Sequence, residues 1–357
     1  MFTVRHGFSL FEADLSHIDQ QLAALWGDLH GARLLLTGGT GFFGIWMVEA
    51  LLYAREARSL DMEIHVLTRD PDGFLARRAP HLAGRQGLVL VPGTVTDFEP
   101  NPAPYTHILH MASETNVEGT RDWAARHLAT AIIGTQRLID IAAAHGTQSL
   151  LITTSGAVYG QSSDRAVNRR WQEGPGCVAD LTGEKYVYGE AKRMMEIMVA
   201  VGADQHGYRA LTARCFAFVG PYLSLDSNYA IGNFIRDAMH DADVIVGGDG
   251  TPLRSYLYAA DLVAWLLTIL LRGQSGRPYN VGGSEAISIA ELARRVNIAI
   301  GGKGNVIVKQ TPVPGAEPHS YLPDLTRTRT ELGLDVTIGL EEAVRRTAAW
   351  YRMRASA

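Results

Sequence analysis

Cysteine is nearly absent from this sequence, which has only Cys177 and Cys215 among its 357 residues. Two cysteines exclude a disulfide framework and a cysteine-rich metal centre. The twelve histidines show no H-x-x-x-H or H-E-x-x-H pattern, so histidine does not provide the ligands of a metal site either. We therefore expect no bound metal, and we expect the chain to work in a reducing cytoplasm.

Long apolar runs and a strong net charge are also missing. No apolar run approaches the roughly 18 residues of a membrane span, and the first residues lack the basic-then-apolar order of a signal peptide. The net charge is −4, and the arginines that supply most of the positive charge are scattered along the chain. We therefore expect neither a membrane nor a nucleic-acid partner.

Short apolar runs alternate with helical patterns through the first two thirds of the chain. The predicted strands span 33–37, 63–68, 87–93, 106–112, 149–155 and 210–216. The predicted helices span 12–29, 46–54, 123–145, 188–205, 259–272, 288–300 and 339–353. This alternation predicts an α/β fold with a doubly wound parallel sheet of the Rossmann type, followed by a smaller mixed C-terminal domain.

The first predicted strand ends in a glycine-rich turn that opens a helix. Gly38, Gly41 and Gly44 have the spacing G-x-x-G-x-x-G. Residues without a Cβ atom allow a tight turn and a close approach of the backbone to a pyrophosphate. The N-terminus of the helix then offers free N–H groups to the anion. The pattern predicts a bound dinucleotide, and a merely close-packed turn is the alternative.

The second predicted strand ends in Thr68-Arg69-Asp70, where a dinucleotide-binding protein contacts the adenosine ribose. An acid at this place favours NAD, whereas arginine accommodates the 2′-phosphate of NADP. Thr68 stands in the usual place of the acid, and Arg69 follows it, so the sequence favours NADP. The alternative is that Arg69 is only solvated while Asp70 caps the helix that begins after Pro71.

A tyrosine and a lysine four residues apart share one helical face at Tyr188 and Lys192. A nearby ammonium favours the phenolate, so we expect Lys192 to lower the pKa of Tyr188 toward the working range. Tyr188 then exchanges a proton with a substrate hydroxyl as hydride moves. Ser155 ends the fifth predicted strand at the carboxyl edge of the sheet, where it can hold the reacting oxygen. Tyr186 competes by position, but Glu190 lies four residues after it.

Several of these segments carry a family resemblance. The segments are TGGTGFFG (37–44), HMASETN (110–116), TTSGAVYG (153–160), YGEAK (188–192), RCFAFVGP (214–221) and GGDGTPLRSYLYAADL (247–262). In order and spacing they resemble the extended short-chain dehydrogenase/reductases, and more narrowly the NAD(P)-dependent nucleotide-sugar epimerase/dehydratase branch. The resemblance runs from about residue 33 to the C-terminus. It implies a cytoplasmic enzyme that acts on a nucleotide-diphosphate sugar.

The resemblance also implies roles for individual residues. Ser155, Tyr188 and Lys192 match the catalytic triad, and Lys192 also holds the nicotinamide ribose. The implied cofactor contacts are Gly38, Gly41, Phe42, Phe43, Gly44, Thr68, Arg69, Thr94, Val95, Met111, Ala112, Ser113, Tyr188, Lys192 and Phe216. The implied substrate contacts are Glu114, Thr115, Ser155 and Arg254, and Arg254 matches the arginine that binds the nucleotide diphosphate.

Departures from the family pattern bear on the reaction. Sugar-nucleotide 4,6-dehydratases carry Asp-Glu where Gly156 and Ala157 stand here, and elimination of the C6 hydroxyl needs an acid. Glu114 and Glu173 are the remaining candidates for that acid. We therefore expect transient oxidation at C4 that leads to epimerisation or ketone reduction. The alternatives are a 4,6-dehydratase, an NADPH-dependent reductase of a non-sugar ketone, and a non-catalytic NAD(P) sensor, against which the intact triad argues.

The domain organisation follows from the same patterns. We expect an N-terminal helical extension over 1–30 that packs on the body, and an NAD(P)-binding domain over 31–220. We expect a mainly substrate-binding domain over 221–357, from which a segment near 253–275 returns to the first domain. The predicted helices 123–145 and 188–205 have broad apolar faces, which in this family form a four-helix homodimer interface; burial within the monomer is the alternative.

Overall fold

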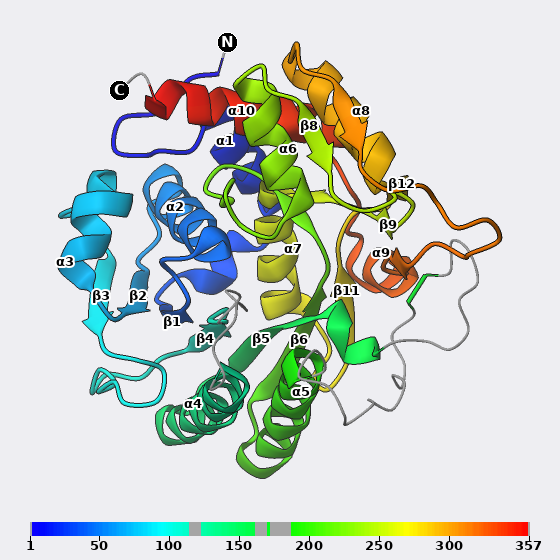
Figure 1. Cartoon of the computed structure of the whole chain (residues 1–357). Helices are drawn as coiled ribbons and strands as arrows, with labels where there is room; N and C mark the ends of the chain where they lie inside the picture. The colour runs from blue at the N-terminus through cyan, green and yellow to red at the C-terminus, as the bar shows by residue number, and fades with distance from the viewer. Residues whose placement is uncertain (1, 114–122, 161–169, 172–186, 356–357) are drawn as a thin grey trace.

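The computed structural model describes residues 2–113, 123–160, 170–171 and 187–355. Its centre is a parallel sheet of seven strands in the order β11-β6-β5-β4-β1-β2-β3 (Figure 1). The strands are β1 (Arg33–Thr37), β2 (Glu63–Thr68), β3 (Leu88–Pro92), β4 (His107–His110), β5 (Ser149–Ser155), β6 (Arg209–Cys215) and β11 (Pro278–Val281). The Rossmann-type fold class predicted from the sequence is therefore confirmed.

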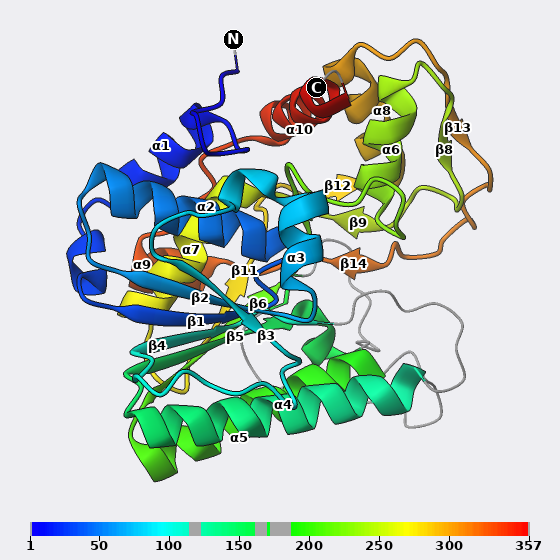
Figure 2. The same cartoon turned by 90° about the vertical axis from the view of Figure 1, so that its left-hand side faces the viewer.

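Helices cover both faces of the sheet, so each strand is buried on two sides (Figure 2). The helices α4 (Trp123–His145) and α5 (Val187–His206) lie on one face, and α2 (Phe42–Ala57) and α7 (Ala259–Arg272) lie on the other. Strand β1 shows the consequence, because Leu35 belongs to the core under α4 and α5 while Leu34 and Leu36 belong to the other core.

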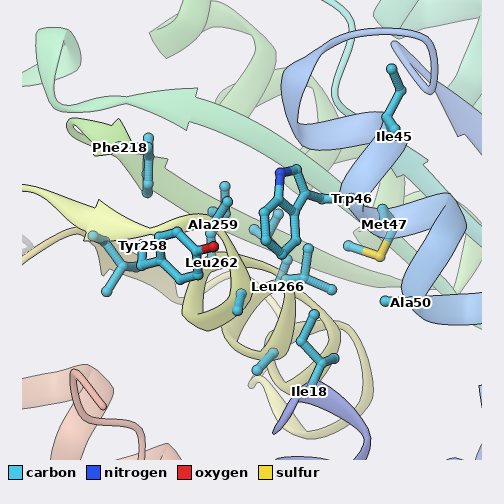
Figure 3. Packing of buried hydrophobic residues seen from close by; sticks show 14 of the residues in the cluster. Ile18, Ile45, Trp46, Met47, Ala50, Phe218, Tyr258, Ala259, Leu262 and Leu266 are labelled. Carbon is cyan, nitrogen blue, oxygen red and sulfur yellow. The ribbon is translucent and has the colours of Figure 1, made fainter. Parts of the chain in front are cut away.

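Helix α7 is the central packing element of the second core (Figure 3). Nearly all of its residues are buried, which is typical of a helix that is hydrophobic on every side. The indole of Trp46 on α2 stands edge-on to the ring of Tyr258, with ring centroids 5.5 Å apart, and its N–H donates to the carbonyl of Pro221 at 2.8 Å. The segment that precedes β11 thus packs under the main sheet and against α2.

The N-terminal segment differs from the single helix predicted over 12–29. Helix α1 (Glu12–Gln21) ends early, and a separate 3-10 turn, η1 (Trp26–Leu29), follows it. The carbonyl of Asp19 accepts from the Trp26 indole at 3.0 Å and from the Arg58 guanidinium at 3.2 Å. These side chains satisfy a carbonyl of the last helical turn, so the chain can fold back and bury Trp26.

Buried carboxylates hold this N-terminal segment to the body. Asp14 on α1 accepts from the Tyr258 hydroxyl at 2.8 Å and pairs with Arg346. Glu49 on α2 accepts from the backbone N–H groups of Ser9 and Leu10, each at 2.9 Å. Helix α1 thus packs against α2 and α7 as part of the main core.

The remaining elements form the flanks of the sheet and a smaller C-terminal part (Figure 1). They are α3 (Pro71–Gly73), the π-helical turn η2 (Phe74–Arg78), η3 (Pro80–Leu82), η4 (Gly156–Tyr159), β7 (Phe218–Val219), α6 (Ala230–Met239), β8 (Val244–Val246), β9 (Leu253–Arg254), β10 (Leu257–Tyr258), β12 (Ile287–Ser288), α8 (Ile289–Ile300), β13 (Val306–Val308), β14 (Ser320–Tyr321), α9 (Thr326–Leu332) and α10 (Leu340–Ala355). Strands β12, β9 and β14 form a three-stranded sheet in which Arg254 and Tyr321 are neighbours. Within the described residues, no helix combines the length and the apolar character that a membrane crossing needs.

Candidate active site

The turn after β1 requires glycine at two of its positions. Gly38 has φ 72°, and a Cβ atom there would lie 2.6 Å from the backbone nitrogen of Ala112. A Cβ atom at Gly44 would lie 2.2 Å from the carbonyl oxygen of Gly38, whereas one at Gly41 would lie 3.3 Å from it. Helix α2 begins at Phe42, directly after the turn. Glycine is needed at 38 and 44 because a Cβ atom there would collide with the protein's own backbone. The turn leads directly into α2, whose N-terminus offers free N–H groups, so this cradle fits a dinucleotide pyrophosphate.

At the end of β2, Asp70 and Arg69 have different surroundings. The carboxylate of Asp70 caps α3, accepting from the Gly73 N–H at 2.9 Å, and it also pairs with Arg77. These two contacts hold the pKa of Asp70 below its usual range. The predicted cap is therefore confirmed. Arg69 is exposed and takes part in no ion pair with the described residues, so its guanidinium remains available to an anion.

The ends of β3 and β4 lie near the cradle. The backbone N–H of Ala112 donates to the Thr37 hydroxyl at 3.3 Å, and Met111 is buried beside it. The Thr94 hydroxyl donates to Asp97 at 2.7 Å. The side chain of Val95 packs in the core under α4, so only its backbone can face a cofactor. The predicted contacts Glu114 and Thr115, and the candidate acid Glu173, lie outside the described residues.

The structure brings the three predicted catalytic residues together at the carboxyl edge of β5. Ser155 ends this strand, and its Oγ accepts from the Ala157 N–H at 3.2 Å. The Tyr188 hydroxyl, from α5, faces the side chains of Ser155 and Ser113, and both act to lower its pKa. Lys192 lies one turn further along α5, with Nζ 5.9 Å from the centroid of the Tyr188 ring. The arrangement places a phenol, a serine hydroxyl and an ammonium beside the glycine cradle.

The electrostatics of this group differ from the expectation that Lys192 would lower the pKa of Tyr188. Burial raises the pKa of Tyr188 to about 12, although its hydrogen bonds with Ser155 and Ser113 act in the opposite direction. Burial also lowers the pKa of Lys192 to about 8, because an ammonium loses hydration in the core. In the protein alone, Tyr188 is therefore a phenol and holds its proton.

Arg254 lies on β9 with an unneutralised charge. Its Nη1 donates to the carbonyl of Leu253 at 2.8 Å and lies 3.3 Å from Nδ1 of His319. No carboxylate within the described parts of the chain pairs with it, and burial lowers its pKa. A partly buried guanidinium without a counter-ion is a ready anion site, which agrees with the diphosphate contact expected of Arg254.

Tyr321 is a site residue that sequence reasoning missed. It lies beside Arg254, whose guanidinium sits 5.6 Å from the centroid of its ring, and its hydroxyl lies 3.1 Å from Oγ of Ser155. Phe216, an expected cofactor contact, also packs against this ring, with ring centroids 4.7 Å apart. Tyr321 carried no signal in the sequence, because it follows no periodic pattern and belongs to a two-residue strand.

Comparison with known proteins identifies the family of this chain. Residues 34–282 match the family described as the NAD dependent epimerase/dehydratase family. The chain belongs to this family. It is therefore an enzyme of a family that depends on NAD, and the glycine cradle is where that family's cofactor fits.

Relatives of this epimerase/dehydratase chain extend over most of its length. UDP-glucuronic acid decarboxylase 1 of Xenopus tropicalis is 28% identical over 322 residues, which are 90% of this chain and 72% of the relative. A dTDP-glucose 4,6-dehydratase of Streptomyces niveus is 28% identical over 324 residues, 90% of this chain and 93% of the relative. The crystal structure of UDP-glucose 4-epimerase from Thermotoga maritima has a TM-score of 0.74 at 20% identity, covering 90% of this chain and 99% of that one, and shares the fold.

Proposed function

We propose that this enzyme modifies a nucleotide-diphosphate sugar by transient oxidation at C4 of the sugar. The observation that carries the proposal is the Tyr188 hydroxyl, which Ser155 hydrogen-bonds at the sheet edge beside the dinucleotide cradle. Arg254 adds a charge without a carboxylate partner among the described residues, which suits a diphosphate. The similar decarboxylase, dehydratase and epimerase are each named for a UDP- or dTDP-linked sugar.

Each residue of the site has a separate role in the first step, the oxidation at C4. A bound nicotinamide in its oxidised form supplies a hydride acceptor and a positive charge. Tyr188 takes the proton of the C4 hydroxyl, and nearby positive charge offsets the burial that raises its pKa. Ser155 holds the reacting oxygen in line with Tyr188. Lys192 contributes its ammonium below a pH of about 8, where it remains protonated.

The residues around Ser155 favour epimerisation or ketone reduction over dehydration. Gly156 and Ala157, which follow it in η4, carry no acid that protonates a leaving hydroxyl. Glu196 on α5 is already engaged, since it accepts from Thr154 at 2.6 Å and pairs with Arg214 at 2.6 Å. A ketone formed at C4 therefore keeps its C6 substituent and is reduced again, from either face in an epimerase.

Decarboxylation is a second candidate, which the curated relatives favour. When C6 is a carboxylate, a ketone at C4 makes it a β-keto acid. The bond between C5 and C6 then breaks, carbon dioxide leaves, and the electron pair forms the C4–C5 enolate, which takes a proton at C5. This route needs no acid for a leaving hydroxyl, so it is compatible with Gly156 and Ala157.

The deciding experiment incubates the purified enzyme, with NAD or with NADP, with UDP-glucose, UDP-glucuronic acid and dTDP-glucose, and follows each reaction by proton NMR. A 4-epimer supports the first proposal, and a UDP-pentose with carbon dioxide supports the second. A 4-keto-6-deoxy product contradicts the preference against dehydration. If neither NAD nor NADP supports turnover of these or a panel of further nucleotide sugars, whereas a simple ketone is reduced with NADH or NADPH, the nucleotide-sugar proposal is wrong.

We also propose that the enzyme binds NAD(P) with a preference for NADP. The argument rests on Arg69, which is exposed at the end of β2 where the adenosine ribose lies in folds of this type. Thr68 beside it brings no negative charge, and the carboxylate of Asp70 is engaged by Gly73 and Arg77. A 2′-phosphate therefore meets a cation there.

The homodimer is proposed on the outer surfaces of α4 and α5, which lie side by side on one face of the sheet (Figure 2). Large apolar side chains are exposed there: Ile132, Ile133, Met194, Ile197 and Val201. Contiguous apolar surface of this kind usually marks an interface. Light scattering coupled to gel filtration tests the proposal, because Ile133→Glu should convert a dimer into a monomer. A monomeric wild-type enzyme contradicts it.

A further inference from the structure

Ser155 has two tyrosine hydroxyls as neighbours instead of the one that the catalytic triad requires. Its Oγ lies 3.1 Å from the hydroxyl of Tyr321 and also hydrogen-bonds Tyr188. The backbone N–H of Ala157 donates to the same oxygen at 3.2 Å. Tyr188 comes from α5 and Tyr321 from β14, so the C-terminal part of the chain reaches the catalytic serine directly.

The bonding capacity of a hydroxyl limits how these contacts are arranged. A serine hydroxyl has one proton to donate and two lone pairs. Ala157 takes one lone pair, which leaves one lone pair and one proton for the two tyrosines. When Tyr188 gives up its proton as a base, its oxygen can only accept, so Ser155 must donate to it. The remaining lone pair of Ser155 is then filled by the Tyr321 hydroxyl, the only donor left in this set.

We propose that Tyr321 is a positioning residue that acts through Ser155: its hydroxyl donates to Ser155 Oγ and so turns the Ser155 proton toward Tyr188 and the reacting oxygen. The direction is the same when a substrate oxygen lies between Ser155 and Tyr188, because Ser155 then donates to that oxygen. This role depends on the proposed oxidation at C4 and adds a positioning residue to that reaction. Tyr321 thereby stabilises negative charge on the Tyr188 oxygen or the substrate oxygen without contacting either atom.

The surroundings of Tyr321 keep it a donor. Burial raises its pKa above the usual value of a tyrosine, so it remains protonated where Tyr188 ionises. The guanidinium of Arg254, 5.6 Å from the ring centroid, attracts the ring and favours donation by its hydroxyl. The Cys215 carbonyl is a weaker second neighbour, at 3.5 Å. Phe216 packs against the ring and holds its orientation.

Other groups that influence ionisation at Tyr188 come from four elements. Cys215 on β6 and Tyr229 just before α6 act on its pKa. Lys192 on α5 and His127 on α4 are neighbours of its ring, and the His127 ring lies 5.5 Å from it. Burial keeps the Cys215 thiol protonated by raising its pKa to about 12. None of these groups hydrogen-bonds the Ser155 hydroxyl in the described residues, so removal of the Tyr321 hydroxyl changes the contacts of Ser155 and, more weakly, of the Cys215 carbonyl.

The test removes a single hydroxyl group, that of Tyr321. Tyr321→Phe keeps the ring that packs against Phe216 and Arg254, and thermal unfolding checks that the protein remains folded. Tyr159→Phe is the matched control, because the Tyr159 hydroxyl donates to Asn280 at 2.7 Å, away from Ser155. The tyrosines are labelled with carbon-13 at Cζ and titrated by NMR in the NAD-bound enzyme. The signal that Tyr188→Phe removes is assigned to Tyr188.

We expect Tyr321→Phe to raise the pKa of Tyr188 by about one pH unit, which is a tenfold change in its ionisation constant. With UDP-glucose as the probe, turnover should fall by about tenfold to a hundredfold while KM changes little. The acidic limb of the pH profile should move upward. In a Ser155→Ala background, Tyr321→Phe should have no further effect, because the intermediary is gone.

Two results overturn the proposal: a Tyr188 titration that Tyr321→Phe leaves unchanged, or an effect of equal size in the Ser155→Ala background. The NMR titration needs no substrate. An enzyme that fails on every nucleotide sugar would therefore contradict the proposed function while the titration still decides the role of Tyr321.

Discussion

The ammonium of Lys192 donates a hydrogen bond to the carbonyl oxygen of Thr153 at 3.1 Å, two residues before Ser155 on β5. This contact places a buried positive charge close to the end of β5 and near the ring of Tyr188. Burial lowers the pKa of Lys192 to about 8, so the folded protein holds this charge at the expense of stability.

Lys192→Met should therefore stabilise the cofactor-free protein near neutral pH. The folded pKa of about 8 lies below the value of 10.5 for a free lysine, so the unfolded chain binds more protons between these values. The stability of the wild type thus rises with pH across that window. At pH 7 the substitution should add on the order of 2 kcal/mol, after the lost hydrogen bond to Thr153, and the gain should vanish near pH 10.5.

Urea unfolding at several pH values measures this gain. Lys303→Met is the control, since Lys303 is exposed and paired with Asp241, which raises its pKa. It should show no gain at pH 7. If Lys192→Met were equally destabilised at pH 7 and pH 10, the conclusion that the buried Lys192 ammonium destabilises the folded protein would be wrong.

Tyr188→Phe should nearly abolish turnover while leaving the fold intact, because it removes only the hydroxyl that Ser155 holds. The expected loss is about a hundredfold to ten-thousandfold, the range for general acid–base help. Steady-state kinetics measures it, and fluorescence titration with NAD should show nearly unchanged cofactor binding. Tyr186→Phe is the control from the competing position in the sequence. A severe loss in Tyr186→Phe with normal activity in Tyr188→Phe would reverse the assignment.

Arg254→Ala should weaken binding of the nucleotide diphosphate. The guanidinium has no carboxylate partner in the described part of the chain, so its charge is free to meet an anion. Calorimetry with UDP should give a dissociation constant about tenfold to a hundredfold higher. Arg294→Ala is the control, since this arginine is paired with Glu291 on the surface of α8. Unchanged UDP affinity in Arg254→Ala would assign Arg254 a structural role.

Arg69→Asp should reverse the order of cofactor affinity. In the wild type, calorimetry should show tighter binding of NADP than of NAD, because the exposed guanidinium meets the 2′-phosphate. The aspartate repels that phosphate and can instead accept from the ribose hydroxyls of NAD. Arg294→Asp, on the surface of α8, should leave the order unchanged. Tighter binding of NAD by the wild type would rule out the preference without affecting the rest of the site.

Local patterns in the sequence determined much of the fold and of the candidate site. The alternation of short apolar strands with amphipathic helices predicted the parallel sheet, because strand and helix periods differ along the chain. The spacing of Gly38, Gly41 and Gly44 predicted the cradle, and the four-residue spacing of Tyr188 and Lys192 predicted their shared face. Such features depend on residues that are close in sequence, so they can be recognised without the tertiary structure.

Only the tertiary structure decided the features that depend on distant segments. Pairing of β9 with β14 brings Tyr321 beside Arg254 and onto Ser155, and no local pattern marks that pairing. The pKa of Tyr188 rises instead of falling, because desolvation depends on what covers a residue and not on the lysine one turn away. Helix α1 stops early, and Arg58 and Trp26 both donate to one carbonyl of its last turn, that of Asp19. Spacing along the chain sets which residues can meet, and packing sets how much water they lose when they do.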